Sequence, residues 1–219
     1  MKIKEVSQQI SEGILKSFQK HGFKYRKTQT EFIRKTETSD QIFRLHYYKE
    51  NDITITIKPE LIIHVHAIES IYKSIAQIEG RPYSTLGNYF SHIRDYDGDA
   101  TNYKRKPTKY WLIENDNDIQ HLIKVIPEYL EEDILPYFDS NSTVSRVDEL
   151  LNEYPDKMCV HNYIYPSRAN IAIIAAKLNN NPHYEKLVKI YEERMEDAEE
   201  NTKIEFFKLK ELLASKKYN

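Results

Sequence analysis

Two residue types are scarce in this sequence, and each scarcity argues against a class of site. The 219 residues include a single cysteine, Cys159. One cysteine forms no intramolecular disulfide and no zinc site built from several thiolates, which fits a reducing compartment. Only five glycines occur, and the P-loop and the dinucleotide fingerprint are absent, as are GxSxG and HExxH. The glycine-rich loops that cradle phosphates are therefore not expected.

The chain also lacks a charge bias and a long apolar segment. Its 32 Lys and Arg residues nearly balance 34 Asp and Glu residues, for a formal net charge of -2. Binding to nucleic acid or to an anionic membrane would thus require a local basic patch. No run approaches the ~18 apolar residues of a membrane span, and no signal-peptide core follows the first methionine. We expect a cytoplasmic protein without a membrane segment or a cofactor.

Residues 23–66 are predicted to form antiparallel strands. In the second half of this segment, apolar residues occupy odd-numbered positions: Ile53, Ile55, Ile57, Leu61, Ile63 and Val65. This alternation indicates a sheet with one face on a core and one polar face. The predicted strands are 24–27, 31–36, 41–48, 52–57 and 60–66. Pro59 separates the last two, since proline donates no hydrogen bond to a central strand; one bent strand and a hairpin are both compatible with this pattern.

Apolar residues at spacings of three and four predict helices around the sheet. They cover residues 3–20, ended by Gly22, residues 67–79, a segment after Asn115 that is kinked or restarted at Pro127, and residues 144–154. Residues 83–107 are predicted to be a long loop and 109–114 a strand. The fold class is α+β: an antiparallel meander with helices on one face in residues 1–155, followed in 156–219 by a docked helical hairpin that turns at 179–181.

Five short phrases accompany this order of elements. They are HGFKYR at 21–26, FIRK at 32–35, STLGNYF at 84–90, KYWLIENDNDI at 109–119 and ILPYFD at 134–139. Through them the chain resembles an uncharacterised bacterial family, domain of unknown function 4304. The resemblance implies an α+β fold and no established activity. The size and layout also resemble immunity proteins of bacterial toxin systems, which is an analogy of fold.

Three histidines of the predicted sheet are candidates for a metal site. His64 and His66 are two residues apart on one predicted strand, and His46 lies on a neighbouring strand. Three imidazoles from adjacent strands bind zinc or a similar ion when they converge. The alternative is that they lie on the polar face and bind water or tyrosine.

A basic and aromatic segment is the candidate for nucleic-acid binding. Lys104, Arg105, Lys106 and Lys109 are interleaved with Tyr103, Tyr110 and Trp111. Such a mixture contacts phosphates and stacks on bases. A charged loop before a strand with buried aromatics explains the same residues, and the slightly acidic chain disfavours nucleic acid.

Two further patterns are ambiguous. Cys159 and His161 lie close in sequence, but this spacing alone does not indicate a nucleophile. Six carboxylates between Glu192 and Glu200 form a solvated helix face or a surface for a basic partner. The leading hypothesis is a non-enzymatic domain that binds another protein, as an immunity or accessory protein; the alternatives are a metal-dependent enzyme or binder and a nucleic-acid-binding protein.

Overall fold

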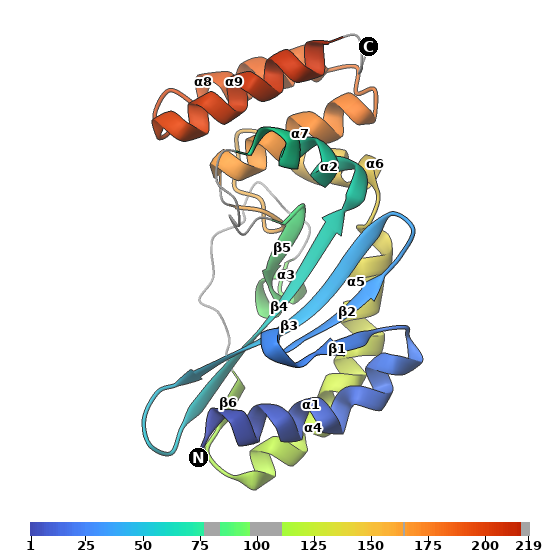
Figure 1. Ribbon diagram of the computed structural model, residues 1–219, viewed down its shortest axis with the longest axis vertical. Helices are drawn as coiled ribbons and strands as arrows, with labels where there is room; N and C mark the ends of the chain where they lie inside the picture. Colours follow the sequence, from blue (N-terminus) through green and yellow to red (C-terminus); the bar gives the residue numbers. More distant parts are fainter. Residues whose placement is uncertain (77–83, 97–110, 164, 216–219) are drawn as a thin grey trace.

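A six-stranded antiparallel sheet is the centre of the fold (Figure 1). The computed structural model describes residues 1–76, 84–96, 111–163 and 165–215. Within these ranges no helix has the length and apolar character that crossing a bilayer requires. The strands are β1 (Lys24–Arg26), β2 (Glu31–Lys35), β3 (Ser39–Lys49), β4 (Ile55–Val65), β5 (Leu86–Tyr89) and β6 (Trp111–Ile113), hydrogen-bonded in the order β1-β2-β3-β4-β5 with β6 also on β4.

Helices precede, interrupt and follow the sheet, so the predicted α+β class is confirmed. They are α1 (Ile3–Lys20), η1 (Lys27–Gln29), α2 (His66–Ile75), α3 (Phe90–Arg94), α4 (Asp116–Tyr129), η2 (Leu130–Ile134), α5 (Leu135–Ser140), α6 (Val144–Asn152), α7 (Tyr165–Leu178), α8 (Tyr184–Glu193) and α9 (Glu200–Ala214).

The end of α1 follows the sequence prediction. Gly22 has φ +83°, a left-handed conformation that other residues adopt with strain. The next N–H, of Phe23, donates to the carbonyl of Phe18 at 3.1 Å. The two rings meet edge to face with centroids 5.3 Å apart. A local cap therefore turns the chain from the buried stripe of α1 into the sheet.

The two faces of the sheet differ in what covers them. On one face, Phe43 and Leu45 of β3 and Leu61 and Ile63 of β4 are at most 1% exposed. In Figure 1, α4 and α5 lie behind the sheet on this side, and no described helix crosses in front of β2 and β3. We call the other side the open face.

β4 is one continuous strand, so the two segments on either side of Pro59 are not a hairpin. Pro59 lies opposite Leu45 of β3. The N–H of Leu45 points away from β4, because it donates to Thr30 at 3.1 Å. Directly opposite residues of an antiparallel pair point their N–H groups either both toward or both away from each other, so the Pro59 nitrogen also points away from β3. On that other edge of β4, Pro59 lies between the residues that pair with β5 and those that pair with β6. At that position the missing N–H costs no ladder hydrogen bond.

Three sequence predictions near the strands are wrong. Ile53 is 66% exposed rather than on the apolar face. It precedes β4 in a turn where the Asn51 side chain accepts hydrogen bonds from the N–H groups of Ile53 and Thr54, at 2.9 and 2.8 Å. The predicted loop 83–107 contains β5 and α3 in its described part. His66 is the first residue of α2, not part of β4.

The helix after β6 begins after Asn115, and its regular α-helical part ends shortly after Pro127. Asn115 caps α4 in a capping box with Asp118. Pro127 lies inside α4, and three residues later η2 is a π-helical turn that leads into α5. Proline removes one helical hydrogen bond, so the irregular turn lies where the helix is already weakened.

The C-terminal helices are held by a buried carboxylate. Asp148 of α6 is 2% exposed and accepts hydrogen bonds from the side-chain amides of Asn152, Asn179 and Asn181, at 2.7 to 3.0 Å. Asn179 and Asn181 form the turn between α7 and α8, which the sequence predicted. The second predicted helix is divided into α8 and α9.

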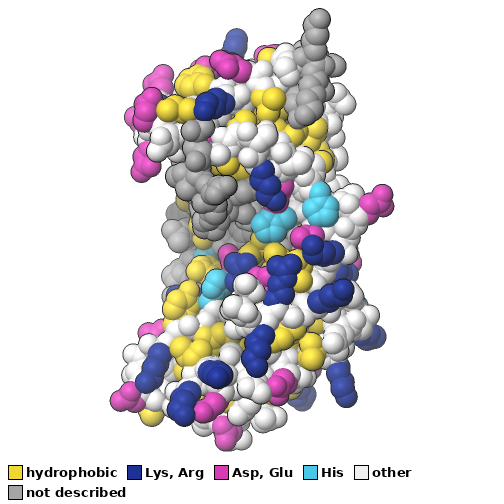
Figure 2. All heavy atoms as spheres, viewed as in Figure 1, with side chains coloured by type: hydrophobic (Ala, Val, Ile, Leu, Met, Phe, Trp, Pro, Cys, Tyr) yellow, Lys and Arg dark blue, Asp and Glu magenta, His cyan; other side chains and the backbone are white. Residues whose placement is uncertain are grey.

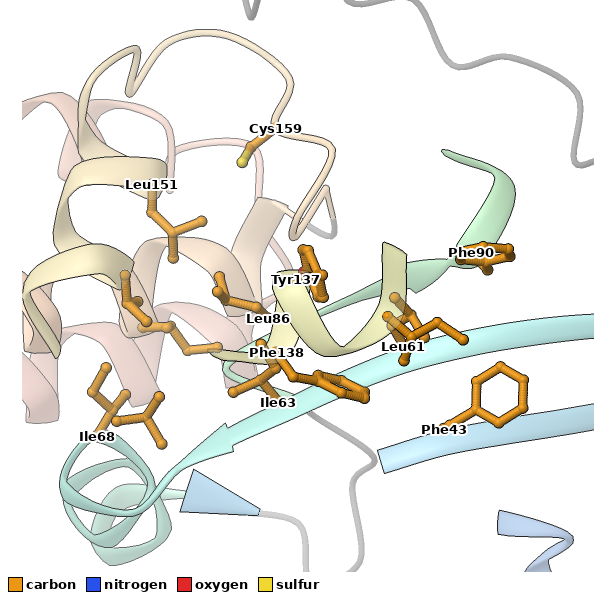
Figure 3. Close-up of a cluster of buried hydrophobic side chains, with 14 of the residues drawn as sticks. Phe43, Leu61, Ile63, Ile68, Leu86, Phe90, Tyr137, Phe138, Leu151 and Cys159 are labelled. Atoms are coloured by element: carbon orange, nitrogen blue, oxygen red, sulfur yellow. The ribbon is translucent and has the colours of Figure 1, made fainter. Parts of the chain in front are cut away.

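One buried apolar cluster extends from the sheet into the C-terminal helices (Figure 3). Figure 3 shows Leu61 and Ile63 of β4 near Phe138 of α5, with Leu151 of α6 beyond. The cluster also includes residues of α7, α8 and α9. Within the described ranges α7 lies against α6, α2, α8 and α9. The helical hairpin therefore packs on the rest of the chain through apolar contacts.

Candidate functional site

Most of the charged side chains of the sheet lie on the open face. Residues paired in register share a face. The open face thus holds five Lys and Arg side chains (Lys24, Arg26, Lys35, Arg44 and Lys58) and three carboxylates (Glu31, Asp40 and Glu60). Figure 2 views this side and shows Lys and Arg side chains gathered over the sheet. A chain with net charge -2 therefore presents a locally basic surface.

An ion-pair row crosses four strands of the open face, from Arg26 of β1 to Glu60 of β4. Glu31 of β2 is 2% exposed and receives hydrogen bonds from Arg44 at 2.8 and 3.1 Å and from Arg26 at 3.2 Å. Arg44 also lies 3.6 Å from Glu60 of β4. A buried carboxylate held by two guanidinium groups fixes their positions before any partner arrives. The row is preorganised.

Apolar side chains lie beneath these charges. Ile33, Ile42 and Ile62 come from β2, β3 and β4 and form a separate cluster, each 5% exposed. At the β1 end is a hollow of about 430 Å³, lined by Gly22, Lys24, Tyr25, Arg26, Ile33 and Lys35. Cations thus surround an apolar floor. Such a surface combines charge recognition with apolar contact.

Aromatic groups border the other end of the ion-pair row. Tyr48 is 41% exposed, and Lys58 lies 4.7 Å from the centroid of its ring. Tyr89 of β5 is near His46, with ring centroids 6.3 Å apart. Partial burial, followed by the proximity of Tyr48 and Glu60, raises the pKa of the Tyr89 phenol. Tyr89 is therefore a neutral hydrogen-bonding group at physiological pH.

The structure separates the three histidines proposed as metal ligands. His46 lies opposite Lys58, six residues along β4 from His64. At a rise of about 3.3 Å per residue this is roughly 20 Å. His46 and His64 are on the same face of the sheet but far apart along the strand direction. The His46 imidazole therefore cannot bind the same metal ion as His64 and His66.

Each of these histidines has a carboxylate partner instead. His46 Nε2 is 2.8 Å from Glu60, His64 Nδ1 is hydrogen-bonded to Glu69, and His66 Nε2 is 3.0 Å from Asp40. Among the residues that the structure describes, no group of three or more His, Cys, Asp or Glu side chains is placed to hold a metal. The arrangement orients imidazoles for hydrogen bonding at a surface.

The proposed nucleic-acid residues Lys104, Arg105, Lys106 and Lys109 lie outside the described residues. Trp111 is described and belongs to β6, where its ring stacks on Tyr129 of α4 with centroids 6.1 Å apart. For Trp111, this packing against a helix agrees with the alternative that the segment is a charged loop followed by a strand whose aromatic residues pack on the protein.

A second polar cluster lies in the interior, beside β5. The Gly87 N–H donates to the carbonyl of His161 at 2.7 Å, and the Asn88 amide donates to the carbonyl of Val160. The His161 ring stacks on Tyr137 with centroids 5.8 Å apart. Burial raises the pKa of the Cys159 thiol, although nearby Arg168 opposes this shift. A buried thiol that resists ionisation is a poor nucleophile, and His161 is engaged by Gly87 through its carbonyl and by Tyr137 through its ring.

We predict that His161 makes the protein sensitive to acid. Burial, and secondarily the charge of Arg146, lowers the pKa of His161 from 6.5 to about 4. Because the unfolded state binds the proton first, this contribution to stability is complete above pH 6.5 and is lost as pH falls toward 4. The expected loss is about 2.5 kcal/mol by pH 4.5. Urea unfolding at pH 7.0, 5.5 and 4.5 measures it.

The matched variant is His161→Asn, which removes the titrating group and keeps a hydrogen-bonding atom near the Tyr137 hydroxyl. Its unfolding free energy should fall less steeply than that of the wild type between pH 6.5 and 4.5, whatever its value at pH 7. Parallel profiles for the two proteins would show that His161 does not carry the effect.

No family model, no curated protein and no solved structure matches this chain. The resemblance to domain of unknown function 4304 therefore stays a prediction. The residues missed by sequence reasoning are Glu31, Arg44 and Glu60. Their signal is the alternation of charge in neighbouring strands, which becomes readable only once the strand register is known.

Proposed function

We propose that this chain is a non-enzymatic protein-binding domain, of the immunity or accessory type, and that the open face is its binding surface. The observation that supports this most is the preorganised row of Glu31, Arg44 and Glu60 over the apolar cluster of Ile33, Ile42 and Ile62. Ordered guanidinium groups lose little entropy when a partner binds.

The partner is proposed to be an acidic protein surface. Five cations against three carboxylates on the open face attract carboxylates. The open face also holds the carboxylates Glu31, Asp40 and Glu60, so its net positive charge is small and suits a protein surface better than the dense charge of a nucleic-acid backbone. The partners of His46, His64 and His66 are carboxylates and one backbone carbonyl in the described part of the chain, rather than a hydroxyl or a thiol to be activated. This favours binding over catalysis.

The test compares two triple charge reversals as baits in affinity capture from the source cells. One carries Lys24→Glu, Lys35→Glu and Lys58→Glu on the open face. The matched control carries Lys4→Glu, Lys16→Glu and Lys124→Glu on α1 and α4, which pack on the other side of the sheet. The wild type and the control should capture the same partner. In titrations with the purified partner, the open-face variant should bind at least about tenfold more weakly at low salt.

Melting temperatures of both variants close to that of the wild type establish that they are folded. Equal capture by the two variants would refute the open face as the binding surface. The proposed function itself would be refuted by any of three results with the wild type: it captures no protein, it shifts an RNA or DNA probe in a gel, or it hydrolyses a substrate.

A further inference from the structure

Helix α9 has apolar side chains on two sides. Phe206, Leu209 and Leu213 are fully buried toward the other helices, and α9 lies against α7 and α2. Ile204 and Phe207 project the other way and are 37% and 43% exposed. A helix that only covered a core would be polar on its outer side. The outer side of α9 therefore carries two partly exposed apolar side chains among polar ones.

A groove lies between α8 and α9 beside Phe207. Its volume is about 450 Å³, and its lining comes from α8, from α9 and from their connection: Lys189, Glu192, Glu193, Met195, Glu196, Lys203 and Phe207. Met195 is 1% exposed and forms the floor, while Phe207 forms one wall. Methionine adapts its shape to different apolar side chains. We call this the α8–α9 groove.

The surface around the α8–α9 groove is net acidic, although Lys189 and Lys203 are among the lining residues. Glu192 is neutralised by Lys210, at 2.8 Å, but no described residue forms an ion pair with Glu193 or Glu196. Asp197, Glu199 and Glu200 extend the carboxylates along the turn into α9. Figure 2 shows Asp and Glu side chains beside hydrophobic ones at this end of the molecule. A partner must bring positive charge together with apolar side chains.

We propose that the α8–α9 groove binds a basic amphipathic helix of a partner protein. Apolar side chains of that helix contact Met195 and Phe207, and its Lys or Arg residues pair with Glu193 and Glu196. A helix supplies both kinds of side chain at spacings of three and four along a groove. The net acidic surroundings of the groove disfavour nucleic acid and anionic lipid. This surface is separate from the open face and of opposite charge, so the chain has two protein contacts.

The probe is a fluorescein-labelled 18-residue peptide with leucines at helical spacing on one side and lysines on the other. Fluorescence anisotropy with the full chain should give saturable binding. Phe207→Ser should weaken it about tenfold, and the double variant Glu193→Lys, Glu196→Lys about tenfold at low salt, with a smaller effect at 1 M salt. Hydrogen exchange with bound peptide should slow in α8 and α9.

Matched controls distinguish this groove from general adhesion. Leu112→Ser changes another exposed apolar residue, 54% exposed, and Glu12→Lys another exposed carboxylate; both should bind as the wild type does. A scrambled peptide of the same composition should bind at least about tenfold more weakly, because its leucines no longer share one side.

Three outcomes would overturn the proposal. The first is that the Phe207→Ser and glutamate variants bind the peptide with the affinity of the wild type. The second is that Leu112→Ser weakens peptide binding as much as Phe207→Ser does. The third is that the wild type self-associates and Phe207→Ser abolishes this, which would assign the groove to a second copy of the chain. The triple variant of the open face should bind the peptide normally. Failure of the groove and failure of the open face are thus separate results.

Discussion

Replacing Asp148 with alanine is expected to lower the free energy of unfolding by about 3 kcal/mol. The carboxylate accepts hydrogen bonds from three asparagine amides in an environment where it is 2% exposed. Without it, the amides of Asn152, Asn179 and Asn181 lose their shared acceptor. Asp148→Asn keeps the volume but replaces one acceptor oxygen by a donor, so a smaller loss is expected. Urea denaturation followed by circular dichroism measures both.

Glu149→Ala is the control for Asp148. Glu149 is the next residue of α6, its side chain is 62% exposed, and its partner is Arg146 at 2.7 Å. An exposed ion pair contributes up to about 0.5 kcal/mol within a helix. A loss below 1 kcal/mol for Asp148→Ala, similar to that of Glu149→Ala, would show that Asp148 does not organise the turn between α7 and α8.

Replacing Arg168 with alanine is expected to cost about 4 kcal/mol. Arg168 lies in α7, is 1% exposed and is among the largest fully buried side chains. Its guanidinium group donates to the carbonyl of Lys157 and to those of Leu151 and Tyr154, at 2.9 and 3.0 Å. Leu151 lies in the last turn of α6, where carbonyls lack helical partners and a positive charge is favourable. Arg168→Ala therefore creates a cavity and also leaves three carbonyls without their hydrogen-bond donor.

Two conservative variants separate these contributions. Arg168→Met fills the cavity but donates nothing, and Arg168→Lys donates with a different geometry. We expect the cost to increase from lysine to methionine to alanine. Arg194→Ala is the matched control, since Arg194 also donates to a backbone carbonyl, that of Asp156 at 2.6 Å, but is exposed. Equal costs for Arg168→Ala and Arg194→Ala would contradict a buried carbonyl clamp.

The sequence predicts elements that are stabilised locally. The cap at Gly22, a helix cap at Asn115 or Asn117 and the apolar stripe of α1 can each be predicted from residues within about one or two helical turns. The long strands β3 and β4 are likewise visible through alternation. Such features need no knowledge of distant residues.

Elements stabilised by distant residues were not predicted. β5 has four residues and α3 has five, too few for a period to be read. β5 is held by β4 on one side and by the carbonyls of Val160 and His161 on the other. Asp148 and Arg168 resemble ordinary surface residues until the helices pack.

The candidate site was predicted only in outline. Alternation places His46 and His64 on the polar face, as the structure has them, but does not give the distance between them along the sheet. That distance depends on the register of β3 against β4, which the turn at 50–54 sets. The same register places Arg44 between Glu31 and Glu60, and so the binding surface could not be assembled from the sequence.

The π-helical turn η2 fixes the rotational phase of the chain that follows it. A π turn accommodates one residue more than an α-helical turn in about the same rotation. Deleting one residue from Leu130–Ile134 would therefore restore α-helical bonding and leave α5 nearly in phase. Deleting one residue from the α-helical part of α4 would instead rotate α5 by about 100°, and Leu135 and Phe138 would leave the core. The position of a length change along this helical segment therefore decides whether the core tolerates it.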